Sequence, residues 1–365
     1  MRYFSMFTGI GGFELGIQRA YDTQRTHIGT ESEPQERTQG RERSTDKQGV
    51  LLHPRDWTAP LCVGYSEIDR YATKVYERNF DGHTNYGDAT KIEPSEINGE
   101  FDLLVGGFPC QAFSIAGKRA GFDDTRGTLF FDVARILKHK RPRHLVLENV
   151  KGLLSHGGGQ TFQTILGVLS DLGYRVEWQV LNSKNFGVPQ NRERVYIIGH
   201  LRGECGRQVL PIRTSTRASL KELTQGVDEA SRVYDMSGIA RTIKNGGGMG
   251  AKTGLYMTQL PEQKVNRTVR TGGSMSVNDK HNWDTHLIQG KLRRLTPKEC
   301  ERLQGFPDDW TKYGGDSYHI ADYDMSDTQR YKMCGNAVTV NTVQAVMERL
   351  YNGGCFSHTT TNDNR

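Results

Sequence analysis

Short apolar runs, each followed by a glycine or an acidic residue, recur along the first 200 residues and predict β-strands. The expected strands cover residues 2–7, 61–66, 101–105, 144–147 and 194–198. Between them, apolar residues recur at helical spacing and predict helices over residues 13–20, 70–79, 129–137 and 162–172. Strands that alternate with helices indicate an α/β fold with a mostly parallel sheet, in which ligands bind beyond the carboxyl ends of the strands.

Two segments depart from this pattern. Residues 22–49 contain a single aliphatic residue, Ile28, and cannot bury enough apolar surface to offset their ordering entropy, so we predict a disordered insertion. Residues 201–291 carry many glycines and a repeat offset by 26 residues, in which 240–249 matches 266–275. These two copies predict similar strand–turn units of a small β-rich domain, each exposing an arginine beside a glycine-rich turn.

The C-terminal part returns to helical periodicity. Helices are expected over residues 297–303 and 339–350, whereas the final segment is mostly polar. The pattern therefore predicts a main domain over 1–200, a small domain over 201–291, a return to the main domain over 292–351, and a disordered tail over 352–365.

Positive charge is concentrated in the small domain. Residues 202–291 hold 14 Lys and Arg against 8 Asp and Glu, so this quarter of the chain carries the whole net charge of +6. A basic segment attached to a neutral body favours a polyanionic partner, because Lys and Arg release counterions when they meet phosphates. The alternative is a solvated, loop-rich face that happens to be basic.

Composition excludes several classes of protein. No stretch approaches the roughly 18 consecutive apolar residues of a membrane span, and the N-terminus lacks the features of a signal peptide. Hydrophobic residues make up 35% of the chain, which indicates a soluble, intracellular protein. The cysteines form no C-x-x-C pair, so a disulfide scaffold and a clustered zinc site are not expected. They are Cys62, Cys110, Cys205, Cys300, Cys334 and Cys355.

Two predicted strands deliver a reactive side chain at their carboxyl ends. Cys110 follows Gly106, Gly107 and Pro109, which together favour a sharp, fixed turn after the strand. Glu148 ends the strand over 144–147, and both side chains are expected in the same crevice. The alternatives are a buried thiol in the core and a carboxylate that caps a turn.

Two arginines flank Glu193 immediately before the last predicted strand. Alternate residues of an extended segment point the same way, so Arg192 and Arg194 are both expected to face the crevice. A solvated charge run is the alternative.

A glycine-rich turn follows the first predicted strand. Gly9, Gly11 and Gly12 lie where nucleotide-binding folds turn from strand into helix, and Glu67 lies 27 residues further on once the insertion is discounted. An acidic residue at about this distance is expected to hold ribose hydroxyls, although it does not identify the cofactor. Asp88 is equally compatible with a turn or cap residue.

Six segments in this order resemble the DNA (cytosine-5)-methyltransferases, chiefly the bacterial and phage modification enzymes. The segments are FTGIGGFE (7–14), GFPCQAFS (107–114), ENV (148–150), QNRERV (190–195), LTPKEC with QGFP (295–300 and 304–307), and GNAV (335–338). The resemblance spans nearly the whole chain. It implies a Rossmann-like, S-adenosylmethionine-dependent methyltransferase domain with a mostly parallel sheet, joined to a small β-rich target-recognition domain over 201–291.

The resemblance also implies roles for single residues. Cys110 matches the nucleophile that adds to C6 of the target cytosine, and Glu148 matches the residue that contacts N3 and the exocyclic amine. Arg194 matches a second ring contact, and Arg192 a neighbour that helps to position the site. S-adenosylmethionine is the implied methyl donor, and no metal is expected. The matching cofactor residues are Phe7, Gly9, Gly11, Gly12, Glu67, Ile68, Asp88, Phe108 and Asn336.

Double-stranded DNA is the implied partner. The candidate DNA-contacting residues lie in the two repeats and are Arg241, Thr242, Arg267 and Thr268. Arginine is the usual reader of guanine edges, although most arginine contacts go to phosphates. The target base must be flipped out of the duplex to react.

The family further implies a cytoplasmic monomer of a bacterium or phage-infected cell, in a restriction-modification or phage self-protection context, with a cognate endonuclease not physically bound. The insertion over 22–49 is not a family motif, and Ile68 stands where the family often has an aromatic residue. Three other readings remain open at this point: a tRNA cytosine-5 methyltransferase of the same fold, an inactive DNA-binding protein, and a nicotinamide-dependent dehydrogenase. The first carries a signature absent here, the intact Cys110 argues against the second, and the basic domain argues against the third.

Overall fold

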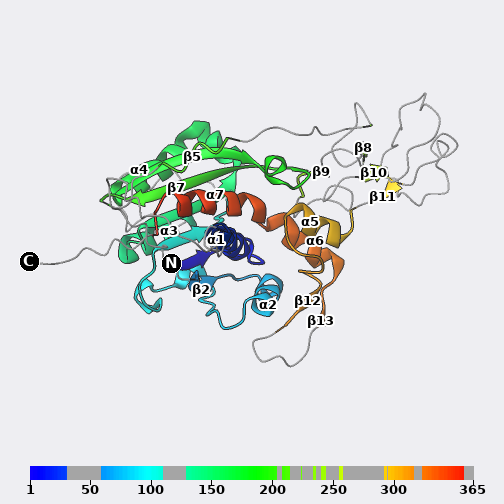
Figure 1. Cartoon of the computed structure of the whole chain (residues 1–365), viewed down its shortest axis with the longest axis horizontal. Helices are drawn as coiled ribbons and strands as arrows, with labels where there is room; N and C mark the ends of the chain where they lie inside the picture. The colour runs from blue at the N-terminus through cyan, green and yellow to red at the C-terminus, as the bar shows by residue number, and fades with distance from the viewer. Residues whose placement is uncertain are drawn as a thin grey trace, which may run out of the picture.

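A six-stranded sheet in the order β2-β1-β3-β4-β7-β5 forms the centre of the protein (Figure 1). The computed structural model describes residues 1–30, 59–109, 129–203, 208–213, 223, 233–235, 240–243, 255–257, 292–293, 295–315 and 323–356. The sheet strands are β1 (Arg2–Met6), β2 (Leu61–Ser66), β3 (Leu103–Gly106), β4 (His144–Val150), β5 (Tyr174–Asn182) and β7 (Glu193–Leu201). Strands β2, β1, β3 and β4 are parallel, whereas β7 runs antiparallel to both of its neighbours. The sheet is therefore mixed, with a parallel majority.

Helices cover both faces of this sheet. The longer helices are α1 (Gly12–Thr30), α2 (Arg70–Asn79), α3 (Leu129–Lys140), α4 (Gln160–Asp171), α6 (Asp327–Asn336) and α7 (Val340–Asn352), and α5 (Pro297–Leu303) is short. Single 3₁₀ turns are η1 (Ala89–Lys91), η2 (Pro94–Glu96), η5 (Lys151–Leu154), η6 (His156–Gly159) and η7 (Ser183–Phe186). The short strands are β6 (Gln190–Asn191), β8 (Val233–Asp235), β9 (Ala240–Arg241), β10 (Leu255–Met257), β11 (Leu292–Arg293), β12 (Tyr313–Gly314) and β13 (Tyr323–Asp324).

Alternate residues of the central strands supply the two hydrophobic layers. In β4, Leu145 and Leu147 pack with α3 and α4, while Val146 points to the opposite face and packs with α1 and α7. A strand buried on both sides is apolar at successive positions, and this explains the continuous run that predicted it. In Figure 1, α7 lies beside α1 on one face of the sheet.

Local capping signals fix several helix boundaries. Asp69 accepts hydrogen bonds from the backbone amides of Tyr71 and Ala72 and begins α2. Thr296 and Glu299 form a reciprocal capping box at the start of α5, with Pro297 at the first helical position. The helices predicted over 70–79 and 297–303 are confirmed with these bounds.

Helix α1 extends nine residues into the predicted disordered insertion and ends at Thr30. That part of the prediction is wrong, because a helix already anchored by its first turns can continue with polar side chains exposed to water. The hydroxyl groups of Thr23 and Thr26 donate to backbone carbonyls one turn earlier, and Gln18 donates to Asp22. The rest of the predicted insertion, residues 31–49, lies outside the described residues.

The small β-rich domain remains an expectation. Within residues 201–291 the structure describes β8 and β10, which form a three-stranded sheet with β11 in the order β11-β10-β8. It also describes β9, which pairs with β6 of the main domain. Among the described helices, none combines the length and apolar character needed to cross a membrane.

Helix α1 also buries one carboxyl group. Glu14 faces strands β1 and β2, and burial raises its pKa to about 7, while the nearby hydroxyls of Ser5 and Tyr76 lower it only in part. The folded protein therefore keeps a proton that the unfolded chain has lost above about pH 4.5. We expect the free energy of unfolding to fall as pH rises from about 4.5 to about 7, by about 3 kcal/mol.

Urea unfolding near pH 5 and near pH 8 measures this dependence. Glu14→Gln should remove it, because the amide imitates the neutral acid at every pH. The exposed Glu96 serves as the matched control, and Glu96→Gln should keep the wild-type pH dependence. Equal pH slopes in wild type and Glu14→Gln would contradict the assignment.

Candidate active site

The carboxyl end of β4 and the beginning of β7 lie side by side at one end of the sheet. In the antiparallel β4–β7 pair, Val150 lies opposite Arg194 and Glu148 opposite Tyr196. Because β7 runs against the parallel strands, its first residues lie where β1, β3 and β4 end. For this reason the polar residues 190–194 lie around the beginning of β7, whereas Glu148 lies near the carboxyl end of β4.

Glu148 and Arg194 form an ion pair at this end of the sheet. Arg194 Nε lies 3.0 Å from Glu148 Oε1, and the two side chains are only 15% and 11% exposed. Arg194 Nη1 also donates to the backbone carbonyl of Glu193 at 2.8 Å, which fixes the guanidinium plane. A Cβ atom on Gly107 would lie 3.4 Å from Glu148 Oε2, so the loop after β3 runs directly beside the carboxylate. The predicted neighbours Glu148 and Arg194 are thus in contact.

Asn149 anchors the loop that leads to the predicted nucleophile. Its buried side chain donates from Nδ2 to the carbonyl oxygen of Phe108 at 2.8 Å, and its Oδ1 accepts from the amide of Val150 at 2.8 Å. The Phe108 ring is buried against Phe130. Sequence reasoning assigned Asn149 no role, although its place directly after Glu148 was a signal. Cys110 itself lies outside the described residues.

Arg192 is buried and faces backbone carbonyls instead of the carboxylate. Its guanidinium donates to the carbonyl oxygens of Ile243, Gly335 and Ala337 at 3.2, 3.1 and 2.9 Å. Burial lowers the pKa of Arg192 to about 9, assisted by the charge of Arg194. Arg192 therefore joins β6 and β7 to the segment at 240–243 and to the junction of α6 and α7, as a positioning residue would.

The first sequence repeat attaches to the main domain at this junction. Strand β9 pairs with β6, with Arg241 opposite Asn191. The Thr242 hydroxyl donates to the Asn191 carbonyl, and the Ile243 side chain is buried. The Thr242 hydroxyl group therefore donates its hydrogen bond within the protein. Arg267 and Thr268 lie outside the described residues.

The glycine turn after β1 is held by Glu67. The amide of Gly9 donates to Glu67 Oε2 at 2.8 Å, and the amides of Ile68 and Asp69 donate to Oε1 at 2.9 and 2.8 Å. The backbone at Phe7 and Gly9 has φ of +55° and +56°, a conformation that favours glycine.

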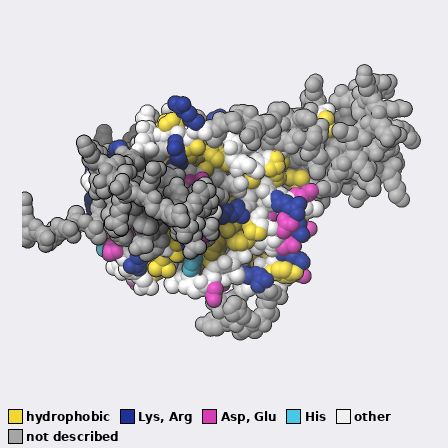
Figure 2. All heavy atoms as spheres, viewed as in Figure 1, with side chains coloured by type: hydrophobic (Ala, Val, Ile, Leu, Met, Phe, Trp, Pro, Cys, Tyr) yellow, Lys and Arg dark blue, Asp and Glu magenta, His cyan; other side chains and the backbone are white. Residues whose placement is uncertain are grey.

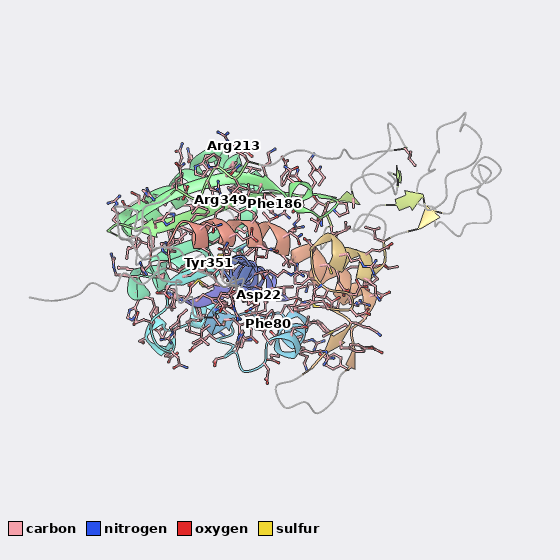
Figure 3. All side chains as sticks on the ribbon, in the orientation of Figure 1. Asp22, Phe80, Phe186, Arg213, Arg349 and Tyr351 are labelled. Atoms are coloured by element: carbon pink, nitrogen blue, oxygen red, sulfur yellow. The ribbon has the colours of Figure 1, made fainter. Side chains whose placement is uncertain are left out.

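Two of the glycines are required by close packing. A Cβ on Gly11 would lie 2.1 Å from Cε2 of Phe80, and one on Gly12 would lie 2.8 Å from the backbone oxygen of Val338. Figure 3 labels Phe80. Gly16 likewise packs on Val343. The C-terminal part of the fold therefore packs against its start.

The surroundings of this turn fit a nucleotide-type cofactor. Space is open around Gly9 and Gly87, where an added Cβ would meet no atom within 4 Å. Ile68 is 74% exposed beside Glu67 and offers an apolar surface of the kind a purine ring covers. The buried Thr8 hydroxyl has no hydrogen-bond partner among the described residues. The residues present fit S-adenosylmethionine.

The remaining predicted cofactor residues lie on separate elements around this space. Asp88 caps η1 by accepting from the amide and hydroxyl of Thr90, and these bonds lower the pKa of Asp88. Asn336 is exposed at the end of α6. The sequence did not predict one further contact, which joins α6 to the start of α2. Lys332 Nζ, on α6, donates to Asp69 Oδ2 at 2.6 Å.

Comparison with known proteins identifies the family of the chain. The family model for C-5 cytosine-specific DNA methylases matches residues 58–352. Type II methyltransferase M1.ScrFI of Lactococcus lactis subsp. cremoris is 40% identical over 296 residues, covering 78% of this chain and 70% of that protein. Type II methyltransferase M.HpaII of Haemophilus parainfluenzae is 40% identical over 319 residues, covering 80% and 84%.

Solved structures share the fold at low sequence identity. A DNMT2 mutant from Spodoptera frugiperda superposes with a TM-score of 0.61 at 17% identity, covering 96% of this chain and 99% of that chain. The Entamoeba histolytica methyltransferase EhMeth gives a TM-score of 0.57 at 15% identity, covering 96% and 98%. The fold and the site thus define a methyltransferase. The chain belongs to the C-5 cytosine-specific DNA methylase family, and its activity is that of a DNA (cytosine-5)-methyltransferase.

Proposed function

We propose that the protein methylates C5 of a cytosine flipped out of duplex DNA, within one short specific sequence, through a covalent bond between Cys110 and C6. The observation that supports this proposal is that the loop after β3 runs directly beside the Glu148–Arg194 ion pair. Asn149 holds that loop at Phe108, two residues before Cys110.

The chemistry follows from the poor nucleophilicity of C5. The Cys110 thiolate adds to C6, and the electron pair of the 5,6 double bond becomes available at C5. S-adenosylmethionine supplies the methyl group when bound. A base then removes the C5 proton, the bond between sulfur and C6 breaks, and the thiolate leaves. Glu148 contacts N3 and the exocyclic amine in this scheme and stabilises the charge that develops on the ring, and Arg194 orients Glu148 and contacts the ring.

Base flipping requires DNA contacts that offset the loss of stacking, a cost of a few kcal/mol. The net positive charge of residues 202–291 supports this segment as the source of phosphate contacts. Basic and acidic side chains are mixed on the described surface in Figure 2. Among the described residues, Lys298 pairs with Asp309 and Arg302 pairs with Asp308. Such paired charges attract phosphates less than an unbalanced basic segment does.

Two repeat arginines provide a direct test of this DNA interface. The double variant Arg241→Ala with Arg267→Ala should weaken DNA binding and reduce the slope of log affinity against log salt by about two, because each lost phosphate contact removes about 0.9. Binding to a duplex across a series of salt concentrations measures the slope. The matched control changes Arg2 and Arg175, which are exposed near the amino ends of β1 and β5 at the opposite end of the sheet from Glu148, and should leave the slope unchanged. An unchanged slope in the repeat variant would place its arginines away from phosphates.

We further propose a modification role in a restriction-modification or phage self-protection context, in the cytoplasm and as a monomer, with a cognate endonuclease that is not physically bound. The relatives named type II methyltransferases support this context.

The experiment that tests the proposed function is expression in a methylation-free bacterial strain, followed by bisulfite sequencing of the genome. Methylation confined to one short motif is the expected result and also identifies the recognition sequence. An unmethylated genome, from folded protein that binds S-adenosylmethionine, would overturn DNA methylation and direct attention to an RNA substrate.

A further inference from the structure

Two histidines and a cysteine meet at the opposite end of the central strands from Glu148. His144 begins β4, and His200 lies opposite it near the end of β7. Cys355 follows α7 and returns to the same point. All three side chains are buried, and each offers a ligand atom that lies within 4.8 Å of the other two. His144 and His200 are 56 residues apart in the sequence, and Cys355 follows 155 residues after His200, so no short metal-binding motif predicts this cluster.

The hydrogen bonds of the two rings fix which nitrogens carry protons. Nε2 of His144 lies 3.0 Å from the backbone carbonyl oxygen of Cys355, and Nε2 of His200 lies 3.0 Å from Glu177 Oε1. A carbonyl oxygen and a carboxylate oxygen both accept hydrogen bonds, so each Nε2 is the donor. Glu177 is held in place by the amides of Val209 and Leu210, at 2.9 Å each.

This assignment leaves two lone pairs facing each other. Nδ1 of His144 lies 3.0 Å from Nδ1 of His200. With both Nε2 atoms protonated, two neutral imidazoles would direct their Nδ1 lone pairs at the same point, which is repulsive. A cation must therefore occupy this point, either a shared proton or a metal ion that both nitrogens bind.

The third side chain favours the metal ion. Cysteine thiolate and imidazole are the ligands that zinc prefers, and metal-bound histidines donate their other ring N–H to a carboxylate or a backbone carbonyl. Both features are present here. A tetrahedral zinc ion needs ligand atoms about 3.3–3.6 Å apart, so small side-chain movements would complete the geometry. Aromatic rings limit access by water, because Phe356 packs edge-on against His144 and against Tyr351 of α7.

We propose that His144, His200 and Cys355 bind one divalent metal ion of the zinc type, with water in a fourth position and Glu177 orienting His200. The site is structural, because it lies at the opposite end of the β4–β7 pair from Glu148 and Arg194. It ties the end of α7 to β4 and β7. Since α7 packs on α1, which carries the glycine turn, the ion would stabilise the face of the sheet that supports the cofactor pocket.

Metal content of the purified full-length protein tests the proposal without any reference to methylation. Protein prepared without chelators, from zinc-supplemented cells, should hold about one zinc ion per chain by mass spectrometry of the metal. Cys355→Ser and His200→Gln should each lose most of it. Cys300→Ser removes an equally buried thiol outside the cluster and should retain the full amount.

A cobalt titration keeps the test valid if the variants fold poorly. Wild-type protein stripped of metal should bind one equivalent of Co²⁺, with the charge-transfer absorption of a cobalt–thiolate bond, and Zn²⁺ should displace it. The same addition of Zn²⁺, but not of Mg²⁺, should raise the temperature of unfolding. Wild-type protein that holds no stoichiometric zinc and gives no cobalt–thiolate band would overturn the proposal and leave a proton between the rings.

Discussion

Cys110→Ala should reduce methyl transfer to duplex DNA by at least about 10⁴-fold, because without the thiolate no group saturates the 5,6 double bond and C5 stays unreactive. Binding of S-adenosylmethionine should remain within about twofold of wild type. The turn that fits the cofactor is built from β1, Glu67 and α1, and none of its described hydrogen bonds involves the loop that carries Cys110. Incorporation of a labelled methyl group and calorimetric binding of the cofactor measure the two effects.

A modified substrate distinguishes the covalent mechanism from mere loss of structure. With fluorine at C5 of the target cytosine, no C5 proton can be removed after methyl transfer, so the bond between sulfur and C6 persists. Wild-type protein should form an adduct that survives denaturing electrophoresis, and Cys110→Ala should form none. The control Cys62→Ala, which removes a thiol from β2, should still form it. Methylation by Cys110→Ala near the wild-type rate would exclude Cys110 as the nucleophile.

The central strands were predictable because burial on both faces makes them continuously apolar. The sequence prediction missed β5, and its position explains why. It is an edge strand, and its exposed Trp178 alternates with polar residues such as Glu177 and Gln179. These polar side chains form tertiary hydrogen bonds, because Glu177 and Gln179 accept from backbone amides of residues 209–212. Such contacts depend on a segment distant in sequence, and no local pattern encodes them.

The candidate site was predictable where it depended on strand ends. Glu148 and Arg194 each adjoin a recognisable strand, and the sheet brings them together as expected. The expectation that Arg192 faces the same way was wrong, because Arg192 lies in the break between β6 and β7, where the alternation of an extended strand does not apply. Its carbonyl partners come from Ile243 and the α6–α7 junction. Only the folded chain places them there.

Glu148→Gln should lower the rate of methyl transfer by about 10²–10³-fold, a loss typical of removing one electrostatic contact to a developing charge. The amide keeps the size of the side chain but not its negative charge. It also leaves Arg194, which is only 15% exposed, without its ionic partner. The rate of adduct formation with 5-fluorocytosine DNA should fall in parallel with turnover, because Glu148 acts when Cys110 adds to the ring. Cofactor affinity should stay near that of wild type.

Glu193→Gln is the matched control for this prediction. Glu193 adjoins Arg194 in the sequence, but its 44% exposed side chain pairs with Lys151 at 2.9 Å, away from Glu148. This variant removes the same charge from the same segment and should retain activity within about twofold, since exposed ion pairs contribute little. Equal losses in both variants would indicate a general effect of local charge. A loss confined to Glu148→Gln, at an unchanged unfolding temperature, would assign the effect to the contact with the base.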